Sequence, residues 1–255
     1  MPKFGPMSVN SGTPLIELIR ADVRLASVID RFGIKFEHYN LPLAKACTQS
    51  NVDARFVMAI YKAFECEKFF PKQELQAFPL RTIIEYLIKT HVYYINQKLP
   101  KLEKLLDALI ANYGNSELML FKVKDFFVEY KRNLIAHIQK EEVYLFPYIL
   151  KLINGVEHVT MPHSLYIILE KYSLEKFAQD HDHADNELEE LGRRLRNFSA
   201  INTHPAQVSL ILEELRQFES DLAMHGRLED EVLLPRAQEL QETAKAKLQV
   251  LCVNN

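Results

Sequence analysis

Glycine is scarce in the sequence and tryptophan is absent. The chain contains seven glycines among 255 residues and no tryptophan. A chain poor in glycine, and rich in leucine, glutamate, lysine and alanine, favours helices because glycine is a poor helix former. Its three cysteines, Cys47, Cys66 and Cys252, are far apart and form no Cys-x-x-Cys pair. This spacing argues against a disulfide framework and against a zinc site built on cysteine.

Charge of one sign and long hydrophobic runs are also lacking. The formal net charge is −3 and is not concentrated in a long run of one sign, so no nucleic-acid-binding surface is expected. No window contains the roughly 18 apolar residues that a membrane span needs, and the N-terminus has no apolar signal core. We therefore expect a cytoplasmic protein that binds neither nucleic acid nor a membrane.

Helix signals divide the chain into several parts. Residues 1–12 hold prolines and glycines and are expected to be a flexible lead, residues 13–70 to be a small helical domain, and 71–79 to be a linker. Beyond it, the apolar periodicity predicts long helices near 80–111, 117–152, 162–197 and 204–247. Long helices with short connections predict an all-α fold, in which 80–255 form an up-down-up-down four-helix bundle.

Two of these predicted helices carry the same motif. It consists of a His, a Glu four residues later, an apolar patch, and a Pro ten residues after the His. The two copies, 88 residues apart, are His137, Glu141 and Pro147, and His225, Glu229 and Pro235. A single His precedes each copy by one helix, His91 by 46 residues and His181 by 44. The bundle therefore resembles a tandem duplication of a helix pair.

The four-residue spacing turns each His and its Glu in the same direction. Residues four apart lie about 40° apart around a helix and one turn apart along it. Imidazole and carboxylate together suit iron, manganese or zinc. Inward-facing His and Glu on the helices of a bundle are the ligands of di-iron and di-manganese sites. We predict a dinuclear site with two carboxylates that can bridge the metals and six ligands: His91, His137, Glu141, His181, His225 and Glu229.

The competing interpretation is a weak surface pair on each helix. For one His-x-x-x-Glu motif that interpretation is favoured, but two aligned copies with two phased histidines favour a metal, because buried imidazoles and carboxylates need partners. The acidic neighbours Glu142, Asp230 and Glu231 are expected to be solvated, or to support the ligands, rather than to be ligands. Pro147 and Pro235 are expected to kink or end their helices.

Four segments of the chain resemble the ligand-bearing helices of a known family. They are 90–100, 137–147, 180–188 and 225–237. They are similar to the hemerythrin-like domain of proteins that repair iron centres damaged by oxidative and nitrosative stress. The resemblance implies two non-haem iron ions, bridged by an oxo group and by both glutamates, with the same six ligands. Other divalent metals are expected as occupants in vitro.

The sequence departs from related proteins at three places. The family usually has a Cys-Cys pair after a Gly-Ile-Asp-Phe turn, whereas residues 33–37 here read Gly-Ile-Lys-Phe-Glu, with no cysteine after them. Many relatives have two adjacent histidines on the first bundle helix, but here His91 is followed by Val92. Oxygen-carrying hemerythrins place a fifth His where this chain has Asp185. Because the cysteine pair is missing, an iron site in this chain does not by itself imply the repair activity of the family.

Three functions are compatible with these features. The favoured one is a di-iron protein of stress response or iron-centre maintenance that reacts with or senses nitric oxide or oxygen, with an iron–sulfur protein as a client. The first alternative is a non-catalytic sensor or carrier of a diatomic ligand or of iron. The second is a metal-free helical interaction protein. The sequence leaves open whether the protein is an enzyme and whether it forms a homodimer.

Overall fold

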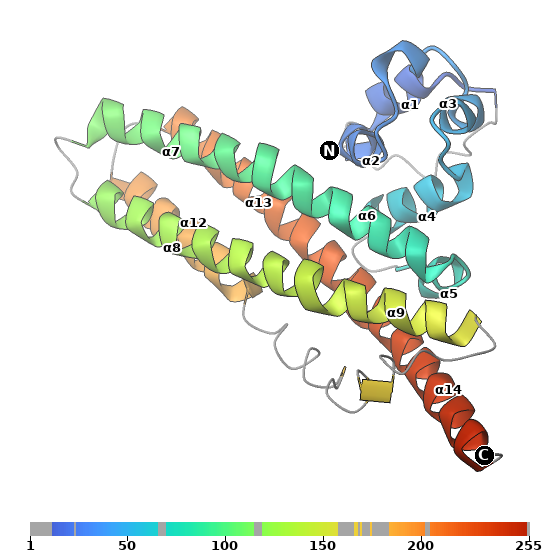
Figure 1. The fold of residues 1–255 in the computed structure, drawn as a ribbon. Helices are drawn as coiled ribbons and strands as arrows, with labels where there is room; N and C mark the ends of the chain where they lie inside the picture. Colours follow the sequence, from blue (N-terminus) through green and yellow to red (C-terminus); the bar gives the residue numbers. More distant parts are fainter. Residues whose placement is uncertain are drawn as a thin grey trace. The chain divides into compact units, whose positions relative to one another are not determined.

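A computed structural model describes most of the chain as helices. It describes residues 12–22, 24–65, 70–114, 119–157, 166, 167, 169, 174, 184–201 and 205–253. Within these residues no strand occurs, so the fold is all-α as predicted (Figure 1). By contact, the chain separates into two compact units, Met1–Phe78 and Pro79–Asn255. Among the described helices, none combines the length and the apolar character needed to span a membrane.

The first unit is made of short helices around a small apolar core. These helices are α1 (Leu15–Ala21), α2 (Arg24–Arg31), the 3₁₀ helix η1 (Phe36–His38), α3 (Leu43–Gln49), α4 (Ala54–Glu65) and α5 (Lys72–Gln76). The side chains of Leu15, Val28 and Ile60 are fully buried. Gly33, just after α2, has a φ of +68°, a conformation that L side chains rarely adopt. The stretch 71–79, expected to be a linker, includes the helix α5.

Four long helices make up most of the described part of the second unit. The first is α6 (Leu80–Tyr93), η2 (Tyr94–Lys98) and α7 (Leu99–Tyr113); the second is α8 (Met119–Lys140), η3 (Glu141–Leu145) and α9 (Phe146–Glu157); the third is α12 (Ala184–Ile201); the fourth is α13 (Pro205–Leu228), η5 (Glu229–Leu233) and α14 (Leu234–Val253). These bounds agree with the predicted helices to within a few residues, except that the start of the third, predicted at 162, lies outside the described residues.

The four long helices close into a ring. Helix α7 lies beside α8, α8 beside α12, α12 beside α13, and α13 beside α7 (Figure 1). Apolar side chains from all four helices meet inside the ring, among them Leu106, Phe127, Leu191 and Phe218, each almost completely buried. Neighbours in sequence are neighbours in space, so the packing confirms the predicted up-down-up-down bundle.

Three of the long helices contain a π-helical turn just before a proline. The residue after each turn donates its backbone N–H to the carbonyl five residues earlier: Leu99 to Tyr94, Phe146 to Glu141, and Leu234 to Glu229. The prolines Pro100, Pro147 and Pro235 come next. A proline has no N–H to donate, and its ring clashes with the carbonyl four residues earlier. The wider π turn accommodates this, so these helices continue past the prolines rather than ending there.

The π turns coincide with the predicted ligands. Glu141 and Glu229 are the first residues of η3 and η5, and η2 begins three residues after His91. Single π turns inside α-helices occur frequently at functional sites. The π turns and the repeated His and Glu motif therefore lie at the same height along the bundle, where we look for the functional site.

Candidate metal centre

His91 and His225 reach the middle of the bundle from its first and fourth helices. Their Nε2 atoms are 3.1 Å apart and their ring centroids 4.9 Å apart. His91 is completely buried and His225 nearly so. A neutral imidazole has one donor and one acceptor nitrogen, so two Nε2 atoms at this distance either share a proton or direct two lone pairs toward a common ion.

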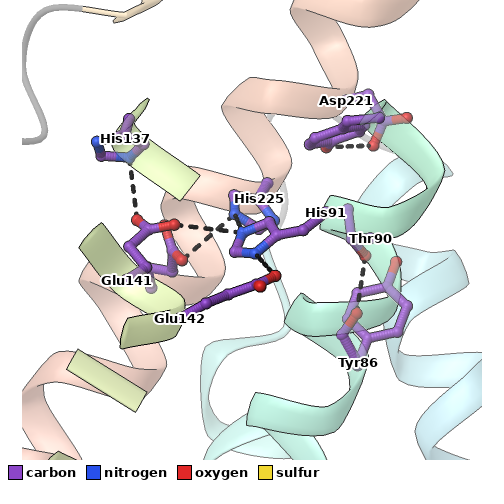
Figure 2. A network of polar contacts seen from close by, with 10 residues as sticks. Tyr86, Thr90, His91, His137, Glu141, Glu142, Asp221 and His225 are labelled. Carbon is purple, nitrogen blue, oxygen red and sulfur yellow. Dashed lines mark hydrogen bonds and ion pairs between the residues drawn. The ribbon is translucent and has the colours of Figure 1, made fainter. Parts of the chain in front are cut away.

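Glu141 lies between two of the histidines. Its Oε1 is 2.9 Å from Nε2 of His137, and its Oε2 is 3.2 Å from Nε2 of His91 (Figure 2). Burial acts to raise the pKa of this carboxyl, which is 2% exposed, but the hydrogen bonds to His137 and His91 outweigh burial and hold the pKa below its usual range. Glu141 is therefore an ionised, buried carboxylate that presents one oxygen to each of two imidazoles.

Glu229 completes a compact buried group. It is 1% exposed, and its Oε1 is 3.3 Å from Nε2 of His225. His91, Glu141, His225 and Glu229 each offer one ligand atom, and these atoms all lie within 4.8 Å of one another. Protein ligands lie about 2 Å from a transition-metal ion, so atoms at this separation can share one. Two imidazoles and two carboxylates, with no thiolate, fit iron, manganese or zinc.

His137 lies at the outer side of the Glu141 carboxylate. Burial acts to lower the pKa of His137, but the hydrogen bond to Glu141 and the charges of Glu141 and Glu229 outweigh it, so the pKa is raised. Its side chain is a quarter exposed. A metal ion bound there would have to displace the proton that these carboxylates favour.

Five of the six predicted ligands thus come together, although their role as ligands stays a prediction. The sixth, His181, lies outside the described residues, and so does His183. On the first bundle helix, where many relatives have two histidines, the second position is Val92, which is 52% exposed while His91 is fully buried. His91 is therefore the position of that pair that faces the bundle interior.

Glu142 makes a contact that its position on the helix only partly suggests. Its Oε1 is 3.0 Å from Nδ1 of His91, on the opposite side of the ring from the cluster (Figure 2). Glu142 is expected from the sequence either to be solvated or to support a ligand. The structure shows it in contact with a predicted ligand, which agrees with the second role. Successive residues are about 100° apart around a helix, which directs Glu142 toward α6 when Glu141 points inward.

A second polar pair beside the site has a weaker signal in the sequence. The Tyr94 hydroxyl donates to Oδ1 of Asp221 at 3.0 Å, and both residues are buried. The ring of Tyr94 meets the ring of His225 edge to face at 5.7 Å. Asp221 lies four residues before His225 and eight before Glu229, so it continues the same inward face of α13. The spacing of Asp221 from His225 and Glu229 is therefore a feature of the sequence from which its inward position could have been predicted.

Comparison with known proteins agrees with this geometry. The model of the hemerythrin HHE cation-binding domain matches residues 82–237, well over half of the chain. The match begins in α6, ends in α14 and includes all six predicted ligands. Among curated proteins, none matches the chain.

Proposed function

The chain belongs to the hemerythrin HHE cation-binding family, and on this premise we propose that it is a non-haem di-iron protein of stress response or iron-centre maintenance. Nitric oxide or oxygen is its proposed small ligand, and an iron–sulfur protein its proposed client. The six ligands of the proposed centre are His91, His137, Glu141, His181, His225 and Glu229. Zinc and other divalent metals are expected to occupy the same ligands in vitro.

The placement of Glu141 carries the proposal of two ions rather than one. Its Oε1 is directed at His137 and its Oε2 at His91, 2.9 Å and 3.2 Å from their Nε2 atoms. A carboxylate that bridges two ions presents one oxygen to each. One ion would thus take His91 and His225, and the other would take His137 and, by the symmetry of the duplicated helix pairs, His181.

The protein residues supply geometry and exclusion of water. The bundle encloses the buried carboxyl side chains of Glu141 and Glu229, and Phe146 stacks on the His91 ring at 5.7 Å between centroids. Bound iron would supply redox chemistry toward small diatomic molecules, while the chain holds the ligands in place. With four histidines rather than the five of oxygen carriers, open coordination positions favour reaction over reversible storage.

Cys47 does not replace the cysteine pair of the repair proteins. It is a free cysteine, and it is buried in α3 of the first unit. Burial, and to a lesser extent the charge of Asp53, raises the pKa of its thiol to about 11. A thiol with this pKa is almost entirely protonated near neutral pH and is a poor nucleophile. The proposal therefore rests on the iron centre and not on thiol chemistry.

Titration of the anaerobic ferrous protein with nitric oxide distinguishes reaction from carriage. We expect consumption of nitric oxide beyond two molecules per chain when a reductant is present, because the open positions let the ligand react. The His137→Ala variant, which lacks one proposed ligand, should consume far less. Stoichiometric binding that reverses fully when nitric oxide is removed would instead support the alternative, a sensor or carrier without turnover.

A further inference from the structure

His91 is contacted at both of its ring nitrogens. Nε2 faces the cluster, 3.1 Å from Nε2 of His225 and 3.2 Å from Oε2 of Glu141. Nδ1 lies 3.0 Å from Oε1 of Glu142. An imidazole that binds a metal through one nitrogen carries its proton on the other, and the partner of that proton decides which nitrogen is which.

We propose that Glu142 is a positioning residue of the metal centre, whose carboxylate accepts the Nδ1–H of His91 and keeps Nε2 available for the ion. This inference rests on the proposed function, since it assigns a role relative to the same ligands. A carboxylate acceptor fixes the tautomer and the orientation of a ligand ring and makes the ring a stronger donor to the metal.

Packing around His91 supports this role. The His91 ring is completely buried and stacks on Phe146, with an angle of 12° between the ring planes. Phe146 stands four residues after Glu142 on the same long helix, about one turn along. One helix therefore holds His91 from two sides, by the Phe146 ring on its face and by the Glu142 carboxylate on its edge.

The Glu142 side chain is only partly enclosed by the protein. It is 38% exposed. A carboxylate with this much access to water could be solvated alone. Instead it turns toward the Nδ1 of a ring that is otherwise shut off from solvent, and it joins α6 to η3 across 51 positions of sequence.

Zinc binding to the whole protein tests the inference, because zinc takes the same ligands and is diamagnetic. The variants are Glu142→Ala, which removes the acceptor, Glu142→Gln, which keeps a neutral acceptor, and Glu129→Ala as a control. Glu129 lies on α8 of the same long helix, and its side chain is 63% exposed and pairs with Arg132. Circular dichroism of each variant confirms that the helices are retained.

We expect the zinc affinity of Glu142→Ala to fall roughly 10- to 100-fold, the usual effect of losing such a partner. Glu142→Gln should fall less, and Glu129→Ala should match wild type. Nitrogen-15 NMR of the histidines should show a slowly exchanging Nδ1–H on His91 in the wild type that exchanges faster in Glu142→Ala. A structural role for Glu142 alone would not move this signal.

Two outcomes overturn the inference in distinguishable ways. If the wild type binds zinc and Glu142→Ala binds it equally well with an unchanged His91 signal, only the role of Glu142 is refuted. If the wild type binds neither zinc nor iron, the proposed function fails and the inference fails with it.

Discussion

The Glu141→Gln variant is expected to lose paired-metal binding, and its metal-free form is expected to be less stable than the wild type. Glutamine keeps the size of the side chain but replaces a charged carboxylate, directed at both His137 and His91, with a neutral amide. Because loss of a supporting residue already costs about 10- to 100-fold in metal affinity, loss of a bridging ligand should cost more than 100-fold. Isothermal titration with ferrous ion or zinc measures this directly.

The stability half of this prediction follows from the contacts of the carboxylate. In the metal-free protein the hydrogen bonds to His137 and His91 outweigh burial and hold the pKa of Glu141 below its usual range, so the folded state favours the ionised carboxylate at neutral pH. A neutral amide removes this stabilisation. A Glu129→Gln variant, altered at an exposed position, should bind metal as the wild type does. Wild-type affinity in Glu141→Gln would show that this carboxylate is not a ligand.

Removing the metal from the wild type is expected to lower the melting temperature by roughly 10–20 °C. An ion present at a hundred times its Kd stabilises the folded state by about 2.7 kcal/mol, and two ions double that. In a domain of this size each kcal/mol moves the melting temperature by about 2–4 °C. The proposed ligands among the described residues come from α6, α8 with η3, and α13 with η5, so bound ions would join separate helices of the bundle.

Scanning calorimetry with and without a chelator measures that shift. The Glu141→Gln variant serves as the matched control, since its melting temperature should not respond to added iron. A wild-type melting temperature that is the same with iron and with chelator would contradict the account, and would favour the metal-free interaction protein.

Much of the fold was predictable from residue spacing. Apolar residues with helical periodicity locate the long helices, and the short connections between them predict which helices are neighbours. The His and Glu motif is also visible because both members lie on one helix, four residues apart. Because all six predicted ligands are assigned to one dinuclear site, His91 and His225 could be expected to lie close together although 134 positions separate them.

The remaining features depend on contacts that periodicity does not encode. A π turn shifts the helix by one residue, and prolines such as Pro147 signal a distortion without saying whether the helix ends or widens. The contact of Glu142 with His91 requires knowing which side of η3 faces α6. The pair formed by Tyr94 and Asp221 joins residues 127 positions apart. The spacing of Asp221 places it on the inward face of α13, but does not say which residue it meets.

The central claim is that the bundle holds a pair of iron ions, and metal analysis of protein purified from iron-supplied cells tests it most directly. We expect about two irons per chain together with the visible absorption of a bridged ferric pair, and the loss of that absorption in Glu141→Gln. Fewer than about one iron per chain, with no spectral change when ferrous ion is added under air, would contradict it.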